Sequence, residues 1–157
     1  MRDYHRLYEE IQVLEKKFGA QRVFWDEQGN WVMVRDLPLP PGLNKQSTNV
    51  IVIIPEHYGN GAPLRDAFID PDLRVRAPKT GKFVEIPHYF QEFPYEQPPI
   101  ETKEDWACKK WRYICLHQPT DRWPQGSILN YLSNVYKFLA EPFRDWQATF
   151  SSYKEHP

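Results

Sequence analysis

The amino-acid sequence predicts a single α+β domain, residues 1–157, with an antiparallel sheet of about four strands. Three observations support this fold class: an amphipathic segment at residues 3–18, a β-branched run at 49–55, and a helical run at 127–140. Strands that follow a first helix and precede a last one are typical of α+β domains, in which helices pack on an antiparallel sheet.

The first helix is predicted over residues 3–18. Its apolar side chains recur at spacings of three and four, which is the period of one helix face. Asp3 is a plausible N-cap, because its side chain can accept a hydrogen bond from the first turn, and Gly19 offers a stop.

The strands are predicted from β-branched and aromatic runs separated by turn residues. Residues 21–26 and 30–35 should form a hairpin around residues 27–30. The continuous run at 49–55 should be the central strand, and residues 67–70 a short fourth one. Residues 74–110 have no clear periodicity, although Phe83, Val84 and Ile86 suggest another short strand. A loop this long in a compact domain is usually functional or contains elements that the sequence conceals.

Composition excludes several classes of function. The formal net charge is -1 and the basic residues are dispersed among acidic ones, so nucleic acid is not an expected partner. No apolar stretch approaches the length of a membrane span, and the N-terminus does not resemble a signal peptide. We therefore expect a cytoplasmic protein that does not bind membranes.

The chain has two cysteines, Cys108 and Cys115, which suits a reducing compartment. They cannot by themselves supply the four ligands of a structural zinc site, and the five histidines are scattered. We expect no metal and no cofactor.

Cys115 lies where a strand-like segment, residues 111–116, meets a polar loop. A thiol at such a junction can be half exposed, as a nucleophilic thiolate must be to react. A lone cysteine is otherwise an ordinary small core residue. The residues that follow favour the nucleophile: Trp123 comes eight positions later, Pro124 comes next, and the helical run 127–140 leads to Glu141 and Pro142.

This series resembles the ubiquitin-conjugating enzyme superfamily, in which an Ile-Cys-Leu carries the thioester cysteine. The counterparts here are Ile114, Cys115, Leu116, Trp123, Pro124, the helical run, Glu141 and Pro142. The starting helix, the strands and a tyrosine-containing turn after Pro55 are compatible with that fold. Residues 37–42 and 68–73 resemble a bacterial branch of the superfamily.

The resemblance implies an activity and partners. Cys115 would accept the C-terminus of a ubiquitin-like protein from an activating enzyme as a thioester, and pass it to an amine of a protein substrate or to water. Bacterial proteins of this kind are encoded with activating enzymes and deconjugating peptidases, and some of those operons act against phage.

One part of the family pattern is missing. The family usually carries His-Pro-Asn shortly before the cysteine, and its Asn supports the oxyanion during attack on the thioester. This chain has no such triplet, and Asp105 and Ala107 occupy the nominal positions. The oxyanion donor is therefore unassigned by the sequence.

Three further residues are candidates for the chemistry. His117 lies two residues after Cys115, so in extended backbone both side chains point to the same face. Its imidazole can lower the thiol pKa, orient the acyl carbonyl or accept a proton, and the alternative is a loop residue that hydrogen-bonds a carbonyl. Asp121 and Asp145 are acids that can hold an attacking lysine, or else solvated surface residues.

Two other functions stay open. One is a catalytically silent member of the same fold, which binds a ubiquitin-like protein or a scaffold. The other is an unrelated thiol hydrolase that uses a Cys115/His117 pair, although hydrolases normally draw their base from elsewhere in the fold.

Overall fold

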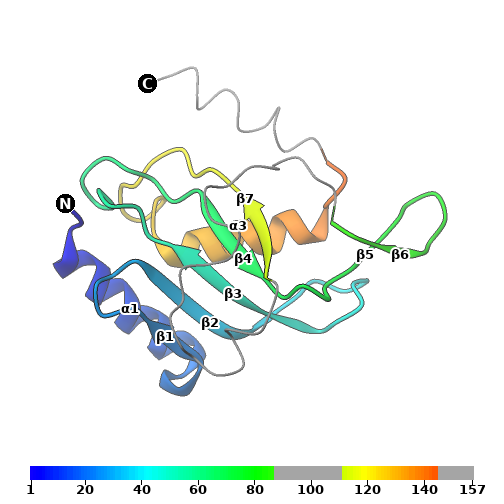
Figure 1. Cartoon of the computed structure of the whole chain (residues 1–157), viewed down its shortest axis with the longest axis horizontal. Helices are drawn as coiled ribbons and strands as arrows, with labels where there is room; N and C mark the ends of the chain where they lie inside the picture. The colour runs from blue at the N-terminus through cyan, green and yellow to red at the C-terminus, as the bar shows by residue number, and fades with distance from the viewer. Residues whose placement is uncertain (87–110, 145–157) are drawn as a thin grey trace.

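The chain is an α+β domain, described here from a computed structural model over residues 1–86 and 111–144. Two α-helices and a five-stranded antiparallel sheet dominate the described part (Figure 1). The sheet order is β1-β2-β3-β4-β7, with β1 Val23–Trp25, β2 Trp31–Pro38, β3 Ser47–Ile53, β4 Asp66–Ile69 and β7 Arg112–Cys115. The helices are α1 Tyr4–Phe18 and α3 Ile128–Ala140, and a 3-10 turn spans Ala20–Arg22.

The sheet confirms the predicted strands and adds one more. β1 and β2 form the expected hairpin, and β3 is the middle strand, as its β-branched sequence predicted. The expected sheet of about four strands gains a fifth because β7 pairs with β4, with Cys115 opposite Asp66. Local sequence marked residues 111–116 as strand-like, but pairing with β4 depends on contacts between distant parts of the chain.

Helix α1 begins and ends as the sequence predicted. The Asp3 side chain accepts a hydrogen bond from the backbone N–H of Arg6 at 3.1 Å, which satisfies one of the free donors of the first turn. Gly19 ends the helix with φ 99°, a conformation that glycine adopts without steric cost, and its N–H binds the Glu15 carbonyl. Leu7, Ile11 and Leu14 turn inward and are buried.

Helix α3 is fixed at its start by two oxygen atoms. The Ser127 hydroxyl accepts a hydrogen bond from the Asn130 N–H at 3.0 Å, as an N-cap should. The Glu10 carboxylate of α1 accepts the Ile128 N–H at 2.7 Å. These bonds place the beginning of α3 next to α1, so both helices belong to the same hydrophobic core.

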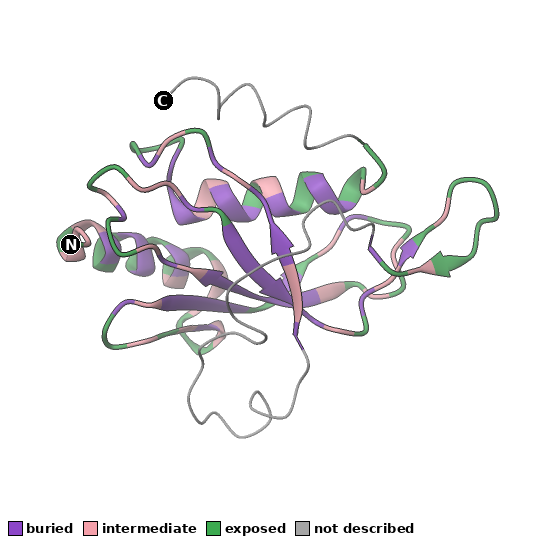
Figure 2. Ribbon diagram, turned by 45° about the horizontal axis from the view of Figure 1, so that its top comes forward, coloured by how far each residue is buried: buried purple, intermediate pink, exposed green. Residues whose placement is uncertain are grey.

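The two faces of the sheet are covered differently. Valines at positions 32, 34, 50 and 52 alternate toward the face that packs against both helices. The intervening positions form a second buried cluster on the opposite face, made of Trp31, Met33, Ile51, Phe68 and Trp111. Figure 2 shows the central strands as almost entirely buried. Cys115 belongs to this second face, because its strand partner Asp66 alternates with Ala67 of the helix-side core.

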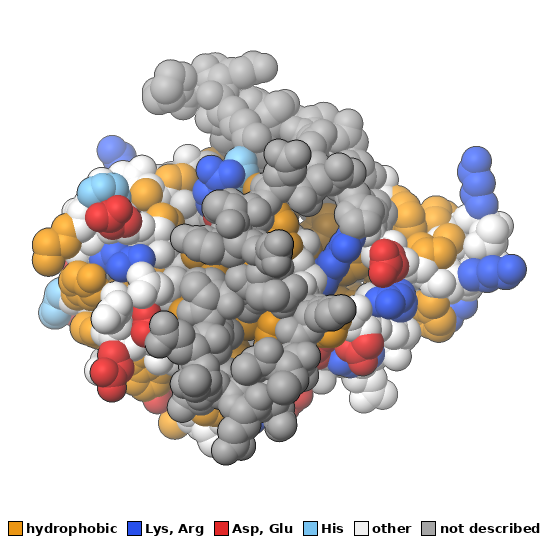
Figure 3. Space-filling view, viewed as in Figure 1, with side chains coloured by type: hydrophobic (Ala, Val, Ile, Leu, Met, Phe, Trp, Pro, Cys, Tyr) orange, Lys and Arg blue, Asp and Glu red, His pale blue; other side chains and the backbone are white. Residues whose placement is uncertain are grey.

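A second, two-stranded sheet forms a hairpin that extends from the body (Figure 1). Its strands are β5 Val75–Arg76 and β6 Phe83–Val84, which confirms the short strand suggested by Phe83 and Val84. Lys79 and Lys82 are exposed near its tip, and Figure 3 shows Lys and Arg side chains gathered there.

Some expectations lie outside the described residues. Cys108 and most of the long segment 74–110 fall in residues 87–110, and Asp145 falls in 145–157. Within the described ranges one helix, α3, follows Cys115. No helix there has the length and apolarity that crossing a bilayer requires.

Candidate thiol site

Cys115 is the last residue of β7 and is 6% exposed. The expected half exposure is therefore wrong. The reason is that Cys115 still belongs to the sheet, opposite Asp66, and the polar loop begins only after it.

The Cys115 sulfur lies 3.0 Å from Nε2 of His117. The two side chains share a face of the extended segment, as their two-residue spacing predicted. This is hydrogen-bond distance for sulfur. Either the thiol donates to a neutral imidazole, or a protonated imidazole donates to a thiolate. The same geometry therefore suits both ends of a proton transfer between the two groups.

The backbone N–H groups on either side of His117 are both hydrogen-bonded. The N–H of Leu116 donates to the Arg65 carbonyl and that of Gln118 to the Leu64 carbonyl, each at 2.9 Å. The buried Gln118 side chain also donates to Ser127 O at 3.1 Å, next to the start of α3. The segment that carries Cys115 and His117 is thus hydrogen-bonded to the residues just before β4 and to the N-cap of α3.

Asp66 and Tyr113 form a polar pair beside the thiol. The Tyr113 hydroxyl donates to the Asp66 carboxylate at 2.6 Å, and both residues lie on the face of the sheet that carries Cys115. Burial raises the pKa of Asp66, although the hydrogen bond from Tyr113 and the charge of Arg65 partly oppose that effect. Burial and the nearby Asp66 likewise raise the pKa of Tyr113, so its hydroxyl keeps its proton.

Arg65 completes the surroundings of the sulfur. Its Nε lies 3.5 Å from Asp66 Oδ2, and its side chain is 57% exposed. Burial alone would lower the pKa of Arg65, but the charge of Asp66, the largest of the opposing effects, leaves it raised. The guanidinium is therefore charged, and it is paired with Asp66, the residue opposite Cys115 in the sheet.

Sequence reasoning did not identify Arg65, Asp66 and Tyr113 as site residues. Asp66 lies 47 positions before Tyr113, and only the antiparallel register brings them together. The available signal was a charged pair, Arg65 and Asp66, directly before a predicted strand that could neighbour the cysteine strand.

The two predicted acids are placed differently. Asp121 is buried, and its Oδ2 accepts a hydrogen bond from the Gly61 N–H at 2.6 Å. Among the described residues no hydrogen bond or ion pair joins Asp121 to Cys115 or His117. Its visible role is to connect the turn before β4 to the loop before α3. Asp145 lies outside the described residues, so its role stays a prediction.

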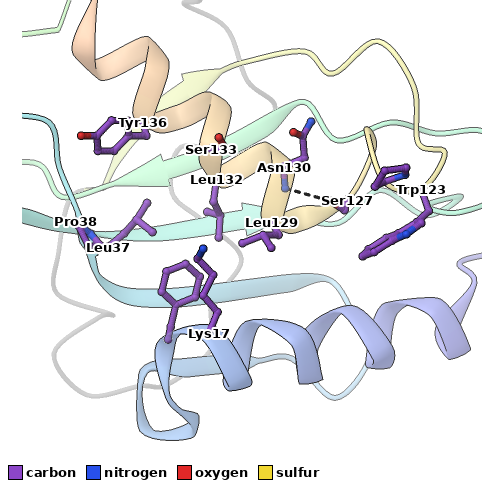
Figure 4. A pocket seen from close by; sticks show the side chains of 12 residues that line it. Lys17, Leu37, Pro38, Trp123, Ser127, Leu129, Asn130, Leu132, Ser133 and Tyr136 are labelled. Carbon is purple, nitrogen blue, oxygen red and sulfur yellow. Dashed lines mark hydrogen bonds between the residues drawn. The ribbon is translucent and has the colours of Figure 1, made fainter.

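Trp123 lines a groove. It is 56% exposed, and its peptide bond to Pro124 is cis. The groove, of about 530 Å³, lies between the end of α1, the end of β2 and α3 (Figure 4). Its apolar lining includes Phe18, Leu37, Leu129 and Leu132, and Cys115 is not part of it.

Comparison with protein-family models, with curated proteins and with solved structures finds no match to this chain. Within the described ranges, no group of three or more His, Cys, Asp or Glu side chains is arranged to hold a metal ion. What the site offers chemically is a thiol in contact with an imidazole, with the Arg65 guanidinium paired to Asp66, the residue opposite the thiol in the sheet. Those groups suit nucleophilic acyl chemistry.

Proposed function

We propose that this protein is a ubiquitin-conjugating-type acyl carrier, with Cys115 as the residue that holds a ubiquitin-like protein as a thioester. The 3.0 Å contact between the Cys115 sulfur and His117 Nε2 is the observation that carries the proposal. A thiol with a base in hydrogen-bond reach is the minimal unit of nucleophilic cysteine catalysis. The family resemblance around Cys115, with Trp123, Pro124 and the helix that follows, suggests that the acyl group is the C-terminus of a ubiquitin-like protein.

In the loading step, the Cys115 sulfur attacks the thioester that joins the modifier to its activating enzyme. A new C–S bond forms at Cys115, and the enzyme's cysteine leaves as a thiolate. The proton lost by Cys115 passes to His117, the base in contact with the sulfur. In the transfer step, an amine of the protein substrate attacks the same carbonyl carbon, and Cys115 leaves in turn.

The architecture is compatible with this proposal. A first helix, an antiparallel meander of four strands, a cysteine-bearing segment and a following helix occur in the order that the resemblance implies. The fifth strand, β7, carries the cysteine itself. A ubiquitin-conjugating arrangement is our inference from that order and from the motif.

A second function is favoured by one observation. Cys115 is only 6% exposed, and a buried thiol must become accessible before an acyl group of protein size can reach it. A catalytically silent binding module would not need this opening. The absence of His-Pro-Asn also favours the silent module, whereas the Cys115–His117 contact favours the acyl carrier.

The test is a loading assay with a ubiquitin-like protein, its activating enzyme and ATP. The acyl carrier should form an adduct that survives a non-reducing gel and disappears with a thiol reductant. Cys115→Ser should convert it into a reductant-resistant oxyester or abolish it. Cys108→Ser, the matched control, should leave it unchanged.

Two outcomes would count against the proposal. An adduct that persists in Cys115→Ala but is lost in Cys108→Ser would move the nucleophile to the other cysteine. No adduct in the wild type, together with measurable binding of the modifier, would support the silent module instead.

A further inference from the structure

The proposed reaction needs hydrogen-bond donors that stabilise an oxyanion, and this chain lacks the triplet that supplies one in the resembling family. When an amine attacks the thioester carbonyl carbon, the two electrons of the C=O π bond move to oxygen. That oxyanion requires hydrogen-bond donors at about 2.7–3.1 Å. The His-Pro-Asn triplet that serves this purpose in the resembling family is absent.

Among the polar side chains near Cys115 in residues 1–86 and 111–144, two have their donor already engaged and a third faces away. Tyr113 has a single hydroxyl proton, which it donates to Asp66 at 2.6 Å. His117 directs Nε2 at the sulfur itself, where it is needed for proton transfer. Arg112 is on the same strand as the thiol but alternates with Tyr113, so it lies on the opposite face from Cys115, and its guanidinium donates to the Ile86 carbonyl at 3.0 Å.

Arg65 is the exception, because a guanidinium carries five N–H donors in a planar fork. One of them, on Nε, lies 3.5 Å from Asp66 Oδ2, and Asp66 is the residue opposite Cys115 in the sheet. The remaining N–H groups of the fork therefore belong to a side chain bound to the residue opposite the thiol, which is the side of the sheet where the thioester carbonyl oxygen would form.

The position of Arg65 is fixed by backbone contacts. It directly precedes β4, and its carbonyl accepts the N–H of Leu116, the residue after Cys115, at 2.9 Å. Asp66, opposite Cys115 in the sheet, forms an ion pair with the guanidinium. Because the Arg65 side chain is 57% exposed, it can follow the carbonyl oxygen once the thiol is acylated.

We infer that Arg65 is the oxyanion donor of this protein, taking the part that the missing asparagine would play; the inference rests on the proposed acyl-carrier function. In the transfer step the C–N bond forms and the carbonyl oxygen becomes an anion that the guanidinium stabilises. The C=O bond then re-forms, the C–S bond breaks, and Cys115 leaves as a thiolate. The proton released by the amine nitrogen passes to a base, for which His117 is in place.

A purely structural role for Arg65 makes a different prediction. In that case the guanidinium would act only by compensating the buried Asp66 carboxylate, and its loss would harm the fold through an unpaired charge. Removing Asp66 at the same time would then restore the rate. If Arg65 stabilises the oxyanion, the double variant stays slow.

The experiment measures single-turnover discharge of the isolated thioester. Wild type and variants are loaded with the modifier, loading is stopped by chelating the Mg²⁺ that ATP requires, and hydroxylamine is added as a small nucleophile. Arg65→Met should slow discharge by about 100-fold, the usual effect of losing one oxyanion donor. Arg65→Lys should fall between Arg65→Met and wild type, because it keeps the charge but loses the planar fork. Loading passes through a similar oxyanion, so Arg65→Met should also load slowly. A longer loading time therefore provides enough of its thioester for the measurement.

The controls separate the possible failures. Arg76→Met removes an arginine of the β5–β6 hairpin and should discharge like the wild type. Arg65→Met/Asp66→Asn should remain as slow as Arg65→Met, and the slowing should be the same across pH because a guanidinium stays charged. If the wild-type thioester forms but Arg65→Met discharges at the wild-type rate, the role of Arg65 is overturned while the acyl-carrier function stands. Rescue of the rate by Asp66→Asn would overturn the role of Arg65 in the same way. A wild type that never loads Cys115 would overturn the acyl-carrier function and the role of Arg65 with it.

Discussion

The carboxylate of Glu10, in the middle of α1, accepts the backbone N–H of Ile128 at 2.7 Å and so caps the start of α3. Glu10 is 3% exposed and is paired with Arg6 at 2.8 Å. The Tyr58 hydroxyl lies 2.8 Å from both the Glu10 carboxylate and the Gly126 carbonyl oxygen, which share its proton. Burial, and then the charge of Glu10, raises the pKa of Tyr58, so this proton is retained.

Removing Glu10 should therefore cost more than removing a surface acid. Glu10→Ala leaves the Ile128 N–H without its acceptor and leaves Arg6 and Tyr58 to share the Gly126 carbonyl, so it should lower the free energy of unfolding by about 3 kcal/mol. Tyr58→Phe, which deletes only the hydroxyl, should lower it by about 1–2 kcal/mol. Urea unfolding measures both.

The matched control is Glu9→Ala. Glu9 is 64% exposed, and within the described part of the chain its ion pair is with His5 on the surface, so its loss should change stability by less than about 0.5 kcal/mol. Equal effects of Glu9→Ala and Glu10→Ala would show that the buried network does not hold the helices together.

Gly126 is predicted to be intolerant of any side chain. A Cβ there would lie 2.3 Å from the backbone carbon of Asp121 and 2.5 Å from the Thr120 carbonyl oxygen. Because backbone cannot move aside as a flexible side chain can, Gly126→Ala should destabilise the protein by more than about 2 kcal/mol. Thermal unfolding of the purified variant is the measurement.

Gly42→Ala separates this clash from backbone strain. Gly42 has φ 93° but no atom within 4 Å of its Cβ position, so only the strain of about 1–2 kcal/mol remains. If Gly126→Ala were the milder of the two, close packing between the loop and the start of α3 would be refuted.

The raised pKa of Asp66 predicts a pH dependence of stability. Burial raises that pKa above its ordinary value of 3.8, so the folded protein binds the proton more tightly than the unfolded chain. The stability that protonated Asp66 contributes is full below 3.8 and is lost as pH rises through the higher folded pKa. Asp66→Asn, which cannot ionise, should gain stability relative to wild type between pH 4 and pH 7.

Urea unfolding of both proteins across that range gives the difference directly. The difference should grow with pH and then become constant above the folded pKa. A difference that shrinks as pH rises would mean that the ion pair with Arg65 outweighs burial and that the pKa of Asp66 is lowered.

The contact between His117 and Cys115 predicts the reactivity of the thiol. In a Cys108→Ser background, His117→Ala should slow alkylation of Cys115 by iodoacetamide at pH 7 by about 10-fold, the effect of one pKa unit on the thiolate fraction. If the imidazole also supports attack on the thioester, transfer should slow more than loading.

His5→Ala is the control, because His5 is 87% exposed and lies on the outer surface of α1. Unchanged alkylation in His117→Ala would mean that the 3.0 Å contact does not activate the thiol and is a structural hydrogen bond.

The elements that the sequence predicted are those whose signal is local. The three-and-four spacing of α1, the Asp3 cap, the β-branched run of β3 and the helix beginning after Ser127 all depend on neighbouring residues. The Cys115–His117 contact is also local, because two residues of extended chain place both side chains on one face.

What the sequence did not predict depends on register between distant segments. Asp66 meets Cys115 only because β4 and β7 pair antiparallel, and no local pattern states which strands will be neighbours. The same pairing buries Cys115, where half exposure was expected. The bond from Gly61 to Asp121 is similarly long-range, which is why a buried structural acid had the pattern of a solvated or catalytic one.

The most direct test of the account is to locate the linkage on the chain. The protein is incubated with a ubiquitin-like protein, its activating enzyme and ATP, quenched in acid without reductant, digested with pepsin at low pH, and mapped by mass spectrometry. The account predicts that the peptide containing Cys115 carries the C-terminal remnant of the modifier, and that a thiol reductant removes it. A remnant found only on Cys108 or on lysines, with the Cys115 peptide unmodified throughout, would contradict it.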